Sequence, residues 1–430
     1  MGIPVARGVR ERTGGSRAHG RGEPLGCTVG NGVADGRVRP GGRRGRAGTV
    51  RPGGRAVTGP TGSTPVSEEV GGAGIRPSEG PLAEVHDLAV VDLDGVVYVG
   101  PDPVPGAPEA IATARAAGLR LCYLTNNASR TPDAVADHLV RLGIAADVEE
   151  VLTSAQVGAA LLARQLEPGA RVLVVGGQGL RVALVDHDLV PVDTMDQDPS
   201  AVAQGFNPDL TWRLLAEGTR GVRAGLTWLA TNLDLTVPTP FGPAPGNGSL
   251  VAAVATAAGR RPDLVAGKPQ PEPFLDAARR FGARRPLVIG DRLDTDLEGA
   301  RAAGMPGLAV MTGVSGVADL VGAPPACRPD HLAADLTGLL ETHPAVEVTP
   351  GDPVVARCRQ AVVAVEQAAA DAVRPRLVVR RTGEDPVDLL RAACAAAWNW
   401  ADAHGGGLAP SSNEVHSACR TFPAASRWAR

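Results

Sequence analysis

Between residues 85 and 342, short apolar runs alternate with stretches whose apolar positions recur at helical spacing. The runs predict strands and the spaced stretches predict helices. We place the strands at 88–93, 119–124, 286–290 and 307–310, and the helices at 106–117, 132–142 and 294–303. Strands that alternate with helices need crossover connections, which are typical of a parallel sheet with helices on both faces. The pattern therefore predicts an α/β fold with a Rossmann-like, parallel-sheet core.

The middle of the chain, from about residue 150 to 260, has elements of its own. Strand-like runs lie at 171–175 and 226–230, and helix-like stretches lie at 209–221 and 249–258. These elements can extend the same large sheet, or they can form a separate inserted module. The pattern alone leaves both arrangements open.

The C-terminal part is predicted to be a small α/β region. Residues 347–353 are rich in Pro, Gly and Asp, and we interpret them as a linker. The region 354–403 is expected to contain a helix, a strand at 376–379 and a second helix. Residues 404–430 are predicted to form a polar tail.

Residues 1–84 differ in composition from the rest of the chain. They are rich in Gly, Arg, Pro, Ser and Thr and contain almost no Leu, Ile or Phe. Such a segment cannot bury enough apolar surface to offset its conformational entropy, so we predict a disordered extension. A basic arm for nucleic acid is the functional alternative. No aromatic residues alternate with the arginines as stacking platforms would, which favours a non-functional extension.

Composition excludes several classes of protein. The net charge of −3 gives no general attraction to nucleic acid or to an anionic membrane, and no apolar run approaches the length of a spanning helix. An apolar segment of the kind that secretory signals contain is absent from the N-terminus. The six cysteines form no C-x-x-C pair, which argues against a zinc site and a disulfide framework. We therefore expect a cytoplasmic protein with no membrane or nucleic-acid partner.

Two aspartates, Asp92 and Asp94, stand at the carboxyl end of the first predicted strand. Ligand sites of open parallel sheets lie at this edge, and Gly95 permits the turn that lets both carboxylates reach one site. Two close carboxylates repel each other unless a cation lies between them. Ligand sets made only of oxygen favour a hard ion such as Mg²⁺. A lone D-x-D is nevertheless more often a solvated loop or a helix cap.

Three further elements follow in order. Thr125, Asn126 and Asn127 follow the second strand and offer hydroxyl, amide and backbone N–H groups that can bind phosphate. Lys268 is the single lysine among 43 basic residues. Gly290-Asp291-Arg292-Leu293-Asp294-Thr295-Asp296 follows the strand at 286–290 and supplies more carboxylates. Each element alone is more often a turn or a helix cap, but four of them in this order are unlikely to occur by chance.

The four elements resemble motifs I to IV of the haloacid dehalogenase superfamily of phosphatases, over residues 85 to 316. The spacing between the first two motifs is too short for a cap domain, so the resemblance places the cap between Thr125 and Lys268. The segments 230–234, 245–249 and 267–269 are similar to subfamily IIA, which contains p-nitrophenyl phosphatases and glycerol-3-phosphate phosphatases. The expected domains are a core at 85–150 and 262–342, a cap at 151–261 and a C-terminal region at 354–403, which resembles a short extra region of bacterial glycerol-3-phosphate phosphatases.

The resemblance also implies roles for individual residues. Asp92 is the expected nucleophile, and Asp94 the general acid and base. Superfamily members that cleave carbon–halogen bonds lack an acid at the second position, which argues against a dehalogenase. The expected phosphate ligands are Thr125, Asn126, Asn127 and Lys268; the expected Mg²⁺ ligands are Asp92, the backbone oxygen of Asp94, and Asp291; Asp296 is expected to support the site, and Asp294 to cap a helix.

The expected function is a Mg²⁺-dependent phosphomonoesterase that acts on a small phosphorylated metabolite, with glycerol 3-phosphate as the leading substrate. Nucleotides, phosphoglycolate and pyridoxal phosphate are alternatives on the same scaffold. A degenerate phosphatase core that senses a ligand is an alternative from another class. Asn207, Asn232 and Asp234 of the cap are candidate substrate contacts, although turns at strand ends explain them equally well. A homodimer through the cap is left open, and Trp398 and Trp400 are expected to pack.

Overall fold

The computed structural model describes residues 74–239, 242–366, 375–405 and 413–419. Most of the predicted N-terminal extension and parts of the predicted tail lie outside the described residues. None of the described helices combines the length and the apolarity that a membrane span requires.

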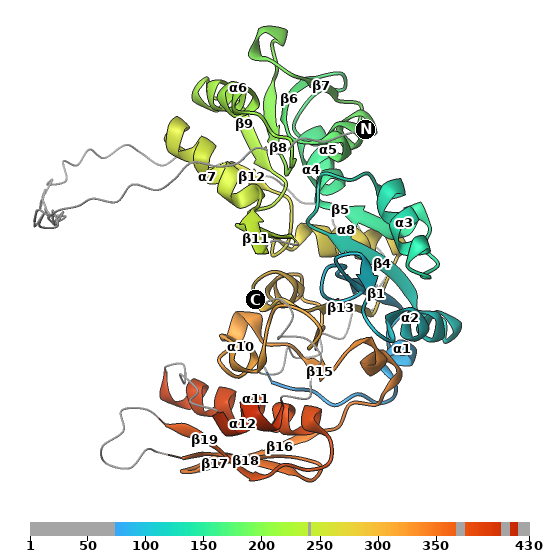
Figure 1. The fold of residues 1–430 in the computed structure, drawn as a ribbon, viewed down its shortest axis with the longest axis vertical. Coiled ribbons are helices and arrows are strands. Elements are labelled where there is room, and N and C mark those ends of the chain that lie inside the picture. Colours follow the sequence, from blue (N-terminus) through green and yellow to red (C-terminus); the bar gives the residue numbers. More distant parts are fainter. Residues whose placement is uncertain (1–73, 240–241, 367–374, 406–412, 420–430) are drawn as a thin grey trace, which may run out of the picture. The chain divides into compact units, whose positions relative to one another are not determined.

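The core is a six-stranded sheet with the order β15-β14-β13-β1-β4-β5, and every neighbouring pair is parallel (Figure 1). The strands are β1 (Leu88–Val91), β4 (Arg120–Thr125), β5 (Val151–Thr153), β13 (Pro286–Gly290), β14 (Gly307–Val310) and β15 (His331–Ala333). The prediction of a parallel α/β core is confirmed. Since β1 lies between β4 and β13, the residues that follow these three strands meet at one edge.

The helices of the core cover both faces of this sheet. They are α1 (Leu82–Val85), α2 (Ala107–Ala116), α3 (Pro132–Arg141), α8 (Glu272–Phe281), α9 (Glu298–Ala302) and α10 (Val317–Val321). Ala89 and Val91 pack in the cluster that contains Ile111 of α2. Leu88 and Val90 pack on the opposite face with Phe274 of α8. Successive side chains of β1 thus point to opposite faces of the sheet, so one buried strand contributes to two apolar layers.

The middle of the chain forms a second sheet, so the inserted-module alternative is the correct one. Its order is β12-β9-β8-β6-β7, all parallel. The elements are α4 (Ser154–Ala163), β6 (Arg171–Val175), α5 (Gln178–Val185), β7 (Val190–Val192), β8 (Ala201–Gln204), α6 (Trp212–Arg223), β9 (Thr227–Ala230), α7 (Asn247–Ala258) and β12 (Leu264–Val265). Two short antiparallel hairpins complete these parts, β2 (Tyr98–Val99) with β3 (Asp102–Pro103) and β10 (Thr236–Thr239) with β11 (Gly242–Pro245).

The predicted module boundaries at 151 and 261 are displaced by a few residues. β5 was assigned to the insertion but hydrogen-bonds to β4 in the core sheet. β12 was assigned to the core but pairs with β9 in the inserted sheet. Both strands are short, and an apolar run of two or three residues does not indicate which sheet it joins.

The C-terminal region is a four-stranded antiparallel sheet, β16-β17-β18-β19, with the long helix α11 along it (Figure 1). The elements are β16 (Val346–Thr349), β17 (Val354–Cys358), β18 (Ala361–Glu366), β19 (Arg376–Arg381), α11 (Pro386–His404) and α12 (Asn413–Ala418). The predicted first helix is wrong, because a hairpin of β17 and β18 occupies that segment. The predicted linker is also wrong in part, because its first residues belong to β16.

The described structure also corrects the N-terminal boundary. Residues 74–84 were predicted to belong to the disordered extension, but Leu82 and Ala83 are buried in the core. Arg76 pairs with Asp330 at 3.0 Å, and Ser78 donates to the backbone oxygen of Gly80. A segment with a few apolar and paired residues can therefore be ordered although the average composition around it is polar.

Candidate active site

Lys268 lies at the centre of the predicted site. Its Nζ atom is 2.5 Å from Asp92 Oδ1 and 2.6 Å from Asp296 Oδ1, and it also donates to the backbone oxygen of Leu124 at 3.3 Å. The Lys268 side chain is only 4% exposed. The chain's single lysine is thus a buried cation that joins residues of the first, second and fourth predicted motifs.

Three carboxylates surround one small space. Oxygen atoms of Asp92, Asp291 and Asp296 all lie within 4.8 Å of one another. Asp291 Oδ2 accepts a hydrogen bond from the backbone N–H of Val314 at 2.6 Å. Asp291 Oδ1 is buried and has no hydrogen-bond partner among the described residues. A buried carboxylate oxygen without a donor is costly, and a hard cation would satisfy it, so the residues present fit a divalent metal.

Two glycines let the backbone approach Asp291 closely. A Cβ atom at Gly313 would lie 1.8 Å from Asp291 Oδ2, and one at Gly95 would lie 2.6 Å from the same oxygen. Gly95 also has φ of +88°, a conformation that favours glycine. The loop at 313–315, which follows β14, therefore forms part of the site. Sequence reasoning missed it, although a glycine next to a strand end is a usable signal.

Burial and neighbouring charges shift the pKa values of the charged groups in this cluster. Burial raises the pKa of Asp291 well above its usual range, and the neighbouring charges of Asp92 and Asp296 raise it further. Burial raises the pKa of Asp296 to about 6, although the Lys268 ammonium opposes this shift. Burial alone would lower the pKa of Lys268, but the charges of Asp296 and Asp92 raise it above its usual range. With all three acids ionised beside one ammonium the cluster would hold an excess of negative charge, and a cation would balance it.

Asp94 lies apart from these three carboxylates. Its side chain is exposed, and among the described residues it does not belong to the group of carboxylates that could share an ion. The backbone between Asp94 and Tyr98 turns sharply, and Gly95 donates from its N–H to Tyr98 O at 2.8 Å. Desolvation by the surrounding protein atoms raises the pKa of the Asp94 carboxyl, although its side chain still reaches solvent. An acid that reaches solvent beside the less exposed Asp92 suits proton exchange with a ligand.

The end of β4 and the loop that follows it hold three of the four predicted phosphate-binding residues, Thr125, Asn126 and Asn127. Thr125 is buried, and its Oγ1 atom accepts from Asn127 N at 3.1 Å. Asn127 Oδ1 accepts from the backbone N–H and the hydroxyl of Ser129, which closes a local turn. The Asn126 side chain points instead toward the Lys268 backbone and Asp234. The structure therefore brings all three to the edge where Asp92 lies.

Of the two remaining acids after β13, Asp294 differs from the expectation and Asp296 agrees with it. Asp294 was predicted to cap a helix, but its carboxylate pairs with the Arg292 side chain at 2.8 Å. Asp296 Oδ2 instead accepts the backbone N–H of Arg292 at 3.2 Å, at the start of the π-helical turn Leu293–Leu297. Asp296 therefore fixes this turn with one oxygen and holds Lys268 with the other.

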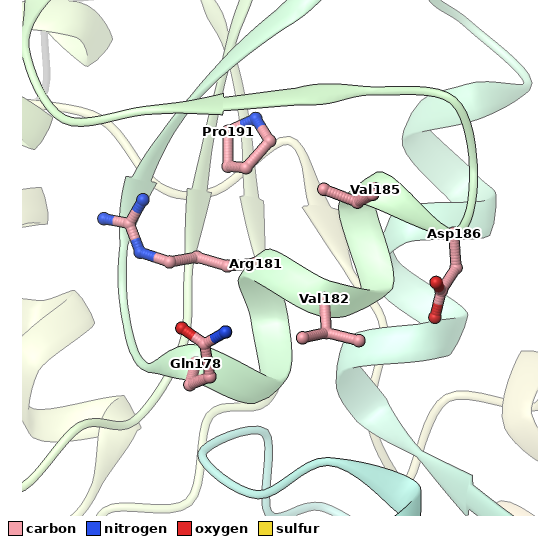
Figure 2. Close-up of a pocket in the computed structure, with 6 residues that line it drawn as sticks. All are labelled: Gln178, Arg181, Val182, Val185, Asp186 and Pro191. Atoms are coloured by element: carbon pink, nitrogen blue, oxygen red, sulfur yellow. The ribbon is translucent and has the colours of Figure 1, made fainter.

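Other residues named from the sequence lie outside this cluster. Trp398 is buried and donates to the backbone oxygen of Leu320, so it packs as predicted. Asn207 Nδ2 donates to the backbone oxygen of Gly176 at the end of β6. Figure 2 shows a separate pocket in the inserted module, lined by α5 and by Pro191 of β7. None of the predicted site residues lines that pocket.

Comparisons with known protein families agree with the arrangement of the four motifs. A model of haloacid dehalogenase-like hydrolases matches residues 89–190, and a HAD-hydrolase-like model matches residues 265–339. The two matches cover both halves of the core sheet and place part of the insertion between them.

Individual relatives are similar over longer stretches. D-glycerol 3-phosphate phosphatase of Mycobacterium tuberculosis is 46% identical over 269 residues, which cover 63% of this chain and 75% of that relative. Acid sugar phosphatase of Staphylococcus aureus is 36% identical over 233 residues, which cover 54% of this chain and 88% of that relative.

Solved structures show the same fold. The glycerol phosphate phosphatase from Mycobacterium tuberculosis, crystallised in complex with magnesium, has a TM-score of 0.67 and 38% identity, and covers 80% of this chain and 99% of that chain. The 4-nitrophenylphosphatase from Thermotoga maritima has a TM-score of 0.56 and 29% identity, and covers 60% of this chain and 98% of that chain. With its four motifs at one edge of the core sheet, the chain belongs to the haloacid dehalogenase-like hydrolases and is a phosphatase of that family.

Proposed function

We propose that the protein is a Mg²⁺-dependent phosphomonoesterase that works through a phosphorylated Asp92. The observation that carries the proposal is the buried Lys268, held between Asp92 and Asp296 in the same cluster as an Asp291 oxygen that accepts no hydrogen bond from the described residues. A phosphoryl group bound here would meet a nucleophile, a fixed ammonium and a site for a hard cation. Phosphoryl transfer depends on positioning and on charge stabilisation, and this arrangement supplies both.

In the first step a carboxylate oxygen of Asp92 attacks phosphorus. A bond forms between Asp92 and phosphorus, and the bond from phosphorus to the ester oxygen breaks. Asp94 donates its proton to the departing alkoxide, which leaves as an alcohol. The raised pKa of Asp94 favours the protonated carboxyl that this step requires.

In the second step water attacks the phosphorylated Asp92. Asp94, now a carboxylate, takes the proton of that water, and the bond between Asp92 and phosphorus breaks to release inorganic phosphate. Thr125 and the backbone of the loop after β4 bind the phosphoryl oxygens throughout. The two steps return Asp92 and Asp94 to their starting states.

Charge on the phosphoryl group is balanced by Lys268 and by the metal. We assign the metal to Asp92, Asp291 and the backbone oxygen of Asp94. When bound, Mg²⁺ would supply positive charge to the phosphoryl oxygens. Asp296 supports the site by holding Lys268 and the turn after β13 rather than by binding the metal.

The inserted module is proposed to be the cap that selects the substrate. Its loops after β8 and β9 carry Asn207, Asn232 and Asp234, and Asn232 and Asp234 hydrogen-bond directly to Asn126 of the core. The likeness to a D-glycerol 3-phosphate phosphatase favours glycerol 3-phosphate as the substrate. The likeness to an acid sugar phosphatase makes sugar phosphates the second candidate.

A steady-state assay tests the proposal. The purified protein should hydrolyse p-nitrophenyl phosphate only when Mg²⁺ is present, and should turn over glycerol 3-phosphate faster than a panel of sugar phosphates, nucleotides, phosphoglycolate and pyridoxal phosphate. Asp92→Asn should reduce kcat by about 10³-fold or more, because an amide cannot act as the nucleophile. Asp196→Asn changes an exposed aspartate of the insertion and is the matched control.

Two results would contradict the proposal. If folded wild-type protein shows no turnover of any substrate with Mg²⁺, the chain is instead the ligand-sensing, degenerate phosphatase. If Asp92→Asn retains wild-type turnover, the nucleophile has been assigned wrongly.

A further inference from the structure

The Asn126 side chain makes two hydrogen bonds to the backbone of one residue, Lys268. Asn126 Oδ1 accepts from Lys268 N at 2.8 Å, and Asn126 Nδ2 donates to Lys268 O at 3.1 Å. The two residues are 142 positions apart in the chain. A side-chain amide that binds both the N–H and the C=O of one residue fixes the position and the rotation of that peptide segment.

The second proton of the Asn126 amide goes to the inserted module. Asn126 Nδ2 donates to Asp234 Oδ2 at 3.0 Å, and the backbone oxygen of Asn126 accepts from Asn232 Nδ2 at 2.7 Å. Asn232 is held in turn by Asn247, whose Nδ2 atom donates to Asn232 O at 2.8 Å. A short hydrogen-bonded path therefore leads from the start of α7 through Asn126 to Lys268.

These contacts leave the Asn126 amide with both donors in use and its oxygen already accepting a bond. Gly267 allows the close approach, because a Cβ atom there would lie 2.5 Å from Asn126 Oδ1. A side chain committed in this way is poorly placed to bind substrate. Its contacts instead serve the residue that carries the site's ammonium.

We propose that Asn126 is a positioning residue that holds Lys268 against Asp92, and that Asp234 connects this contact to the inserted module. The expected loss of kcat rests on the proposed function, whereas the expected position of Lys268 does not. It assigns the Asn126 side chain a role other than the phosphate contact expected from the sequence. It also implies that the insertion influences the catalytic lysine, through Asn126, as well as the substrate.

The first test is kinetic and uses p-nitrophenyl phosphate with Mg²⁺. Asn126→Ala should lower kcat by about 10- to 100-fold, as a misplacement of about 1 Å does, with little change in KM. A rise in KM at unchanged kcat would show that Asn126 binds substrate and would overturn the proposal. Thermal melting of each variant separates these effects from unfolding.

A double-mutant cycle asks whether Asn126 acts through Lys268. In a Lys268→Arg background, Asn126→Ala should lower kcat by less than about 3-fold, because the group that Asn126 positions has already changed. If the kcat loss of the double variant equals the product of the two single-variant losses, Asn126 acts independently of Lys268 and the proposal is wrong.

The link to the insertion has its own conservative variant. Asp234→Asn keeps an oxygen that accepts from Asn126 Nδ2, so it should lose less kcat than Asp234→Ala. Asp196→Ala, an exposed aspartate of the same module, is the control for the loss of a charge. Asn126→Asp places two carboxylates side by side, and adding Asp234→Asn should restore part of its kcat. Equal losses in Asp234→Asn and Asp234→Ala, or no restoration in the double variant, would remove Asp234 from the proposal.

A crystal structure of Asn126→Ala tests the positioning without any activity. The Lys268 backbone should shift and Nζ should move away from Asp92 Oδ1, from the present 2.5 Å. An unchanged Lys268 would overturn the inference even if the enzyme is active. A moved Lys268 in a protein that hydrolyses no phosphate ester would support the inference and contradict the proposed function.

Discussion

At Lys268 the chain, whose other basic residues are all arginine, places a compact ammonium. Nζ has three acceptors within 3.3 Å, from Asp92, Asp296 and Leu124, and the side chain is almost completely buried. A lysine head is a compact point charge, whereas a guanidinium is a wide planar fork with five donors. The surrounding oxygens are arranged for the smaller group.

Lys268→Arg should therefore fold and lose most of its phosphatase activity. The larger head would push Asp92 or Asp296 from its position, and we expect kcat to fall by about 10²-fold or more. Steady-state kinetics with p-nitrophenyl phosphate and a thermal melt measure the two effects. Arg279→Lys, the reverse exchange at an exposed ion pair on α8, is the control. Wild-type turnover by Lys268→Arg would show that any cation is sufficient at this position.

The sequence predicts the acids and the lysine of the site but not the contacts that hold them. Asp92, Thr125 and Asp291 follow apolar runs, and parallel strands bring their carboxyl ends to one edge. The contacts of Asn126 with Asp234 and Lys268 join residues 108 and 142 positions apart, and no local pattern encodes such pairs.

At the scale of elements, the apolar runs of β1, β4, β13 and β14 were predicted, whereas the short buried strands β5, β8 and β15 and the C-terminal hairpin were not. β1, β4 and β13 are continuous apolar runs, as strands covered on both faces are. β17 and β18 are rich in Val and Ala, and the turn between them is Arg359-Gln360 rather than the Asn-Gly that signals a hairpin. Without that signal, the segment reads as a helix.

The C-terminal elements share one apolar cluster with the core. Leu320 and Leu332 of the core pack in the same cluster as Ala356 of β17 and Leu390 of α11. Arg391 of α11 donates to the backbone oxygen of Leu332 at 2.6 Å. These contacts cross the boundary at which the sequence predicted a linker.

Truncation after residue 345 should therefore destabilise the phosphatase core. It would expose the core side of this cluster, and each fully buried leucine contributes about 1.5–3 kcal/mol. We expect an insoluble protein or a melting temperature lower by about 10 °C or more. Truncation after residue 419 keeps all described elements and is the control. Equal melting temperatures of the wild type and the protein truncated after residue 345 would show that the two regions fold independently.

At the scale of the whole molecule, two buried histidines lie between the core and α11. His331 and His343 are in edge-to-face contact, with ring centroids 5.0 Å apart, and Arg391 Nη2 lies 3.4 Å from His343 Nδ1. Burial lowers the pKa of His331 to about 3 and that of His343 to about 4. Both rings are therefore neutral in the folded protein at pH values where an unfolded chain would protonate them.

This difference should make stability depend on pH. A histidine with a lowered folded pKa stabilises the fold fully above the unfolded pKa of about 6.5, and that stability is lost as pH falls below it. When the pH falls from 7.5 to 5, each ring should lower the free energy of unfolding by about 2 kcal/mol. His343→Gln removes one of the two titrating rings. The free energy of unfolding of this variant should therefore fall less than that of the wild type over this pH range. Parallel curves for the two proteins would mean that His343 does not titrate differently on folding.

In the proposed mechanism Asp92 carries the phosphoryl group during turnover, and acid quenching can trap that covalent intermediate. The enzyme would be mixed with Mg²⁺ and a substrate labelled with ³²P in the phosphoryl group, quenched in acid within the first turnovers, and digested for peptide mapping. Label is expected on the peptide that contains Asp92, and none is expected in Asp92→Asn. Turnover of the substrate with no label on that peptide, or with label elsewhere, would contradict this mechanism.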